Sequence, residues 1–122
     1  MYLPKKYNVI EINILNNLQI LVISDKKSLK KFLSKNSWME NNVHHCLDDN
    51  GGSYVLFNEE NVPHFVLYIN NVSNRVIIHE CTHLVHQIME SKGIPISVDN
   101  SEIMAYMTDY LSTQVMNLLI KC

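Results

Sequence analysis

Hydrophobic and polar residues alternate along the first part of the chain. Within residues 7 to 15, isoleucine recurs at every second position from residue 10 to residue 14. This period of two places the isoleucines on one side and predicts a half-buried strand. Residues 18 to 23, with the sequence LQILVI, are apolar almost throughout, which favours a more central strand. Asn16 and Asn17 can turn the chain between the two strands, because asparagine tolerates positive φ. The residues on the buried side of the first strand are Ile10, Ile12 and Ile14.

The period then changes to that of a helix. Asp25 can cap this helix, which ends between residues 36 and 38. Residues 48 to 52, with the sequence DDNGG, are the strongest turn signal in the chain. A reversal of the chain is therefore expected after the first helix. The apolar positions of that helix are Leu29, Phe32 and Leu33.

Two short strands and two longer helices are predicted in the second half. In the strand over residues 63 to 69, residues 65 to 69 are apolar throughout, as in an interior strand, whereas residues 53 to 58 alternate more and are placed at the sheet edge. A helix from residue 73 to 92 ends before Gly93 and Pro95. The last helix begins near Asn100 or Ser101. Its inward-facing residues are expected to be Ile103, Met107, Tyr110, Leu111, Val115, Leu118 and Leu119.

Composition and charge limit the domain count and the partners. The 122 residues, 47% of them hydrophobic, suffice for one core, so residues 1–122 are expected to form a single domain. A formal charge of -2 leaves no basic excess, and nucleic acid is not expected as a partner. Lysines cluster between residues 26 and 35, but their helical spacing favours a solvated face over a nucleic-acid patch.

The cellular compartment is inferred from the N-terminus and the cysteines. Polar residues such as Glu11 and Asn13 interrupt the apolar N-terminal stretch, so neither a signal peptide nor a membrane-spanning helix is predicted. Three widely spaced cysteines, Cys46, Cys81 and Cys122, differ from the dense, even sets of small secreted proteins. A reducing, cytoplasmic location is therefore expected, with no membrane partner.

The helix over residues 73 to 92 carries the motif His79-Glu80-Cys81-Thr82-His83. Residues four apart on a helix are separated by about 40° and about 6 Å, so His79 and His83 can give two imidazole nitrogens to one Zn²⁺. Glu80 is turned by about 100° from His79, so its carboxylate can reach a water molecule on the metal without binding the metal. A general base needs this arrangement.

A hydrolytic zinc site needs a third protein ligand and an open position. Glu102, which is expected in the first turn of the last helix, is the preferred third ligand, and Asp99 in the preceding loop is the competing one. His86 lies on the same stripe as His79, but the rise of about 10 Å is too long for both to bind one ion. A packing role, or an outer role near the metal site, is therefore favoured for His86.

His79-Glu80-x-x-His83, together with Ser101-Glu102-x-x-Ala105-Tyr106, resembles the gluzincin branch of the zincin metallopeptidases, in particular the very small metallopeptidases of phages and prophages. Residues 53 to 119 carry the resemblance. It implies an α+β, minimal zincin-like fold, in which a small twisted mixed sheet packs on an active-site helix and a C-terminal glutamate helix. It also implies zinc on His79, His83 and Glu102, Glu80 as the base, and a peptide substrate along an edge strand.

The sequence departs from related patterns at several positions. Metzincins are excluded, because His86 and Met89 stand where that branch has glycine and a third histidine. The thermolysin pattern has Asn before the glutamate and Asp four residues after it, where this chain has Ser101 and Tyr106. Asp109 can replace that Asp or be a solvated carboxylate. Tyr106 can steady an oxyanion or be a half-buried packing residue.

Other residues with metal-binding or nucleophilic side chains have simpler interpretations. His44-His45-Cys46, near Asp48 and Asp49, is interpreted as a flap or specificity loop rather than a second metal site, because sequence neighbours point apart. His64 is interpreted as a strand-end residue, with lining of the cleft as the alternative. Cys81 should pack in the core, because it is turned by about 160° from His83.

We therefore expect a zinc-dependent peptidase that acts on a peptide or protein substrate. The alternative is a catalytically inactive zincin-like module that binds a protein and uses zinc to brace two helices. A further alternative is that the motif occurs by chance on an amphipathic helix.

Overall fold

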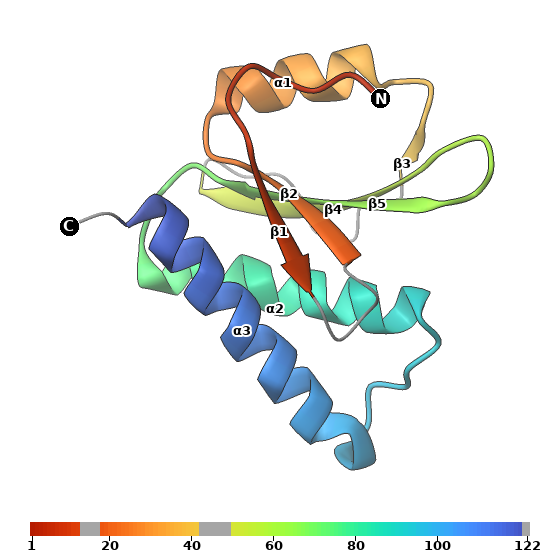
Figure 1. Ribbon diagram of the computed structural model, residues 1–122, viewed down its shortest axis with the longest axis vertical. Coiled ribbons are helices and arrows are strands. Elements are labelled where there is room, and N and C mark those ends of the chain that lie inside the picture. The colour runs from red at the N-terminus through yellow and green to blue at the C-terminus, as the bar shows by residue number, and fades with distance from the viewer. Residues whose placement is uncertain (13–17, 42–49, 121–122) are drawn as a thin grey trace.

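The computed structural model describes residues 1–12, 18–41 and 50–120, and these residues form an α+β fold (Figure 1). Within these ranges, five strands form one mixed sheet in the order β1-β2-β5-β4-β3. The strands are β1 (Asn8–Ile12), β2 (Leu18–Ile23), β3 (Glu40–Asn41), β4 (Gly51–Phe57) and β5 (Pro63–Ile69). The helices are α1 (Lys26–Lys35), α2 (Asn74–Ser91) and α3 (Ser101–Leu119), and a 3-10 turn at Val98–Asn100 precedes α3.

The pairing of the strands explains their burial. Strand β2 is antiparallel to β1 and parallel to β5, and β4 is antiparallel to both β5 and β3. Strand β5 is therefore interior, as the continuous apolar sequence predicts, and its residues from Phe65 to Ile69 are buried. In β1, Ile10 and Ile12 are buried while Val9 and Glu11 are exposed, which confirms the predicted alternation.

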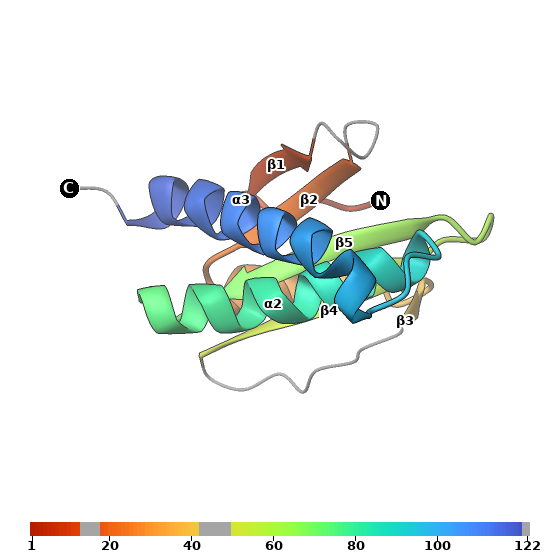
Figure 2. The same cartoon turned by 90° about the horizontal axis from the view of Figure 1, so that it is seen from below.

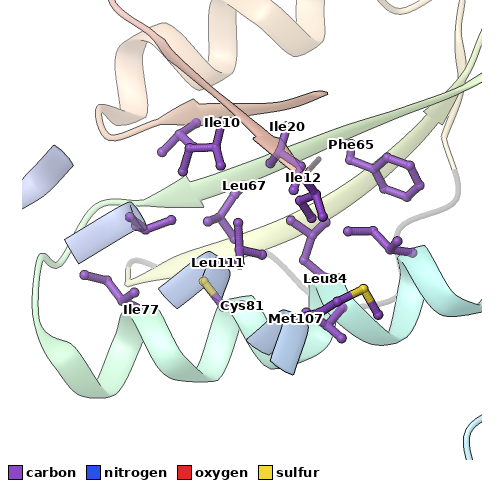
Figure 3. Packing of buried hydrophobic residues seen from close by; sticks show 14 of the residues in the cluster. Ile10, Ile12, Ile20, Phe65, Leu67, Ile77, Cys81, Leu84, Met107 and Leu111 are labelled. Carbon is purple, nitrogen blue, oxygen red and sulfur yellow. The ribbon is translucent and has the colours of Figure 1, made fainter. Parts of the chain in front are cut away.

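Helices cover both faces of the sheet. Helix α1 lies on one face, and α2 and α3 lie side by side on the other (Figures 1 and 2). Side chains from the sheet interdigitate with residues such as Ile77, Leu84 and Leu111 of the two long helices to form the larger core (Figure 3). The smaller core between the sheet and α1 includes Phe32 and Tyr68.

Both predicted helix starts are confirmed by their capping hydrogen bonds. The carboxylate of Asp25 accepts from the backbone N–H of Lys27 and Ser28, and the Ser28 hydroxyl also donates to it; these bonds hold the pKa of Asp25 below its usual value. The hydroxyl of Ser73 accepts from the Val76 N–H at the start of α2. Helix α2 ends before Gly93, whose φ of 69° is in the left-handed region that favours glycine.

Three predictions are wrong in detail. Gly51 and Gly52 begin β4 instead of forming a turn. Strand β4 is not the edge strand, because β3 pairs with its last two residues. Ile103 does not face inward, since 42% of its surface is exposed. The predicted turn at residues 16 and 17, and the interpretations of residues 44–46, 48 and 49, lie outside the described residues.

The outer face of α1 agrees with the solvated face expected for its lysines. All five lysines of α1 are exposed, as a solvated face requires. Among the described residues, no helix has the length and apolar character needed to cross a membrane.

Truncation of Leu84 tests the packing of α2 on the sheet. Leu84→Ala removes a fully buried side chain, so it is expected to lower the free energy of unfolding by about 2–5 kcal/mol. Ile78→Ala, on the exposed side of the same helix, is the matched control and should change it by less than about 1 kcal/mol. Urea unfolding followed by circular dichroism measures both; equal losses would contradict the observed orientation of α2.

Candidate metal and catalytic site

The imidazole rings of His79 and His83 lie next to each other on α2. Their centroids are 4.8 Å apart and their planes meet at 74°, because the side chains project from successive turns of one helix. His79 is exposed and His83 is half-buried. Two neighbouring imidazoles on a rigid element can fill two coordination positions of a zinc ion. Two of the three predicted ligands therefore lie side by side.

The carboxylic acid between them in sequence, Glu80, is buried. Only 2% of its surface is exposed, because it faces the first residues of β4 and not the solvent. A Cβ atom on Gly51 would lie 3.1 Å from the Glu80 Cγ and 2.6 Å from the backbone oxygen of Tyr68. The absence of a side chain at Gly51 therefore allows the strand, the helix and the Glu80 side chain to approach this closely.

Burial raises the pKa of two neighbouring groups. The pKa of Tyr54 rises to about 12, with smaller contributions from Tyr68 and Glu80. Burial also raises the pKa of Cys81 to about 12. Cys81 is fully buried, which confirms its predicted place in the core, and its thiol stays protonated at neutral pH.

The third predicted ligand is not assembled with the histidines. Glu102 lies in the first turn of α3 and is exposed, and Asp99 is exposed in the 3-10 turn before it. Across residues 1–12, 18–41 and 50–120, no set of three His, Cys, Asp or Glu side chains is placed to hold a metal ion. The described structure thus brings His79 and His83 together without Glu102.

A groove of about 460 Å³ lies between α2 and α3, and His86 lines it. Asp109 lies in the wall contributed by α3, while His79 lines a different cavity. His86 therefore faces α3, as a packing role requires. Asp109 of α3 lines the same groove as His86. The remaining lining includes Ile78, Thr82, Met104, Thr108 and Ser112.

Tyr106 and His64 lie apart from the histidine pair. Tyr106 is 54% exposed and stacks on Tyr110 at a centroid distance of 6.4 Å. The Tyr110 hydroxyl donates to the Glu11 backbone oxygen, which ties α3 to β1. His64 is at the start of β5, where burial lowers its pKa, and it lines a cavity with N-terminal residues such as Met1. Tyr106 is therefore exposed and not half-buried as expected for a packing residue, because its ring covers Tyr110 from the solvent side, whereas the position of His64 agrees with a strand-end histidine.

A second cavity, of about 320 Å³, adjoins the histidine pair, and we call it the polar pocket. Both His79 and Glu80 lie in its wall. Arg75 contributes the only arginine or lysine side chain in its described lining. Arg75 was not predicted as a site residue, although its spacing of four residues before His79 places it on the same stripe of α2. The other residues that line the polar pocket are Asn50, Asn71, Ser73 and Val76.

Comparisons with protein-family models, with curated proteins and with solved structures found no match for this chain. The resemblance to zincins therefore depends on the motif residues and their placement alone.

Substitution of Gly51 tests the close approach of β4 to α2. In Gly51→Ala the new methyl group meets the Tyr68 carbonyl and Glu80, so we expect a loss of roughly 1–3 kcal/mol in the free energy of unfolding. Gly93→Ala is the control: it has open space but a positive φ, so about 1 kcal/mol is expected from backbone strain alone. Guanidinium unfolding measures both, and wild-type stability of Gly51→Ala would contradict the observed contact.

Proposed function

We propose that this protein is a zinc-dependent peptidase. The observation that carries the proposal is the pair of adjacent imidazoles, His79 and His83, beside the buried carboxyl group of Glu80 on the same helix. Two nitrogen ligands and a carboxyl group next to them in sequence are three of the parts that metal-assisted hydrolysis of a peptide bond needs, and a third metal ligand is the fourth. The substrate is a peptide or protein.

Each residue has a distinct proposed role. His79 and His83 would hold the zinc ion, with Glu102 as the third ligand. When bound, zinc supplies a Lewis acid that polarises the scissile carbonyl and makes a nearby water more acidic. Glu80 would accept a proton from the attacking water and return it to the leaving amine, as a general base and then a general acid. The wall formed by β4 would keep bulk water from its carboxylate.

The exposed position of Glu102 favours one alternative. If the third position is never filled by the protein, zinc on the two histidines would brace the helix without catalysis, and the protein would be a zincin-like binding module. The odd, widely spaced cysteines favour a reducing, cytoplasmic setting for either function.

Replacement of Glu80 by glutamine separates catalysis from metal binding. Glu80→Gln keeps the shape of the side chain but removes the base, so hydrolysis of a broad peptide library should fall by at least about a hundredfold while the zinc content is unchanged. Glu90→Gln, an exposed acid on the same helix, is the matched control and should cleave at the wild-type rate. Cleavage is measured by mass spectrometry; an undiminished rate for Glu80→Gln would rule out its role as the base.

Zinc affinity identifies the ligands. The wild type should bind about one zinc per chain, and His79→Ala, His83→Ala and Glu102→Ala should each weaken binding by more than about a hundredfold, which exceeds the loss typical of residues outside the ligand shell. Asp99→Ala tests the competing third ligand and should keep the wild-type affinity, and Glu90→Ala, which removes an exposed acid on α2, is the control. Competition with a chromophoric chelator measures the affinities. Unchanged affinity in Glu102→Ala would remove Glu102 from the ligand set, and absence of stoichiometric zinc in the wild type would contradict the proposed function.

A further inference from the structure

The polar pocket shares two residues with the proposed catalytic site. His79 and Glu80 form one side of this cavity of about 320 Å³, so a group held in it would lie beside the reacting bond. Its volume suits a side chain or a chain end, since it is near the lower end of the range of small-ligand pockets. The polar pocket is therefore placed to select a part of the substrate.

Arg75 gives the polar pocket one side chain that can bind an anionic group. Arg75 is the only arginine in the chain, and it lies in this wall with an exposed side chain. Glu80 is the only acidic residue in the described lining, and the first turn of α2 contains none. A guanidinium is planar and presents a fork of N–H donors, which matches the two oxygens of a carboxylate.

Asparagine side chains make the floor of the polar pocket well ordered. The Asn71 side-chain amide donates to the Asn50 side-chain oxygen at 3.1 Å, and the backbone N–H groups of Asn70 and Asn71 donate to the Asn50 backbone oxygen. These bonds join the start of β4 to the loop before α2. These hydrogen bonds hold Asn50 and Asn71, two polar residues of the lining, in place relative to each other.

The helix sets the distance between Arg75 and the proposed metal ligands. Arg75, His79 and His83 are spaced by four residues, so the backbone of Arg75 lies about 6 Å, or one helical turn, before that of His79. An extended peptide advances about 3.3 Å per residue. A carboxylate bound by Arg75 would accordingly belong to a residue one or two positions from the scissile bond.

We propose that the polar pocket binds a carboxylate of the substrate through Arg75, so that the peptidase cleaves next to an acidic side chain or a free C-terminus. The role of the polar pocket in substrate selection rests on the proposed peptidase function. The binding of a carboxylate can be tested without catalysis.

The binding test uses zinc-free protein and three small probes. N-acetylglutamic acid α-amide carries only a side-chain carboxylate, N-acetylglutamine carries only a terminal carboxylate, and N-acetylglutamine amide carries neither. NMR titration of the wild type should show at least one acidic probe binding about tenfold tighter than the neutral probe, with shifts at residues 73–79. Whichever acidic probe binds more tightly identifies the source of the carboxylate.

Arg75 variants decide whether this residue is responsible. Arg75→Gln should abolish the advantage of the acidic probe, and Arg75→Lys should keep part of it, because the charge remains without the fork of donors. Lys92→Gln removes an equal charge near the other end of α2 and should behave as wild type. Equal binding of acidic and neutral probes by the wild type, no binding of any probe, or an unchanged preference in Arg75→Gln would each overturn the proposal.

Cleavage assays separate this proposal from the proposed function. Zinc-loaded wild type should prefer peptides with an acidic residue or free C-terminus near the cleaved bond, and Arg75→Gln should lose that preference and retain cleavage. Cleavage without such a preference overturns the role of the polar pocket alone. Carboxylate binding by a protein that hydrolyses no peptide overturns the peptidase and leaves the polar pocket as a binding site.

Discussion

The close packing of α2 beneath β4 and β5 determines the character of the site. It buries the carboxyl group of Glu80 while leaving the imidazoles of His79 and His83 on the open side of the same helix. Removing a carboxylate from water costs free energy that other groups have to offset, so this placement opposes the stability gained from the apolar packing around it. Gly51 makes the interface possible, because any larger residue would meet both the helix and the neighbouring strand.

Polar residues continue along the interface beyond Glu80. Gln87, two turns further along α2, and Ser53 on β4 are both buried, and neither side chain has a hydrogen-bond partner within the described part of the chain. Such groups cost stability that an apolar residue would not, about 1–3 kcal/mol each. The core below β5 and β2 is apolar by contrast. Apolar packing that stabilises the fold is thus densest in the middle of the sheet, whereas Glu80 lies toward β4.

Much of the fold follows from local patterns in the sequence. Apolar periodicity and capping residues such as Asp25 and Ser73 predict the four longer strands and three helices. Both signals can be recognised in the sequence because they involve residues only a few positions apart. The two-residue strand β3 has no period to detect. Gly51 was interpreted as part of a turn because glycine serves both in turns and at close backbone contacts, and only tertiary structure separates the two uses. The histidine pair was predictable from the helix alone, whereas the position of Glu102 depends on how α3 approaches α2.

The central claim is that one zinc ion is held by His79 and His83 together with a single carboxylate. X-ray absorption at the zinc edge of the loaded wild-type protein measures the ligands directly. The account predicts two imidazoles at about 2.0–2.1 Å with the remaining positions filled by oxygen. A spectrum with sulfur at about 2.3 Å, or one without imidazole scattering, would contradict it.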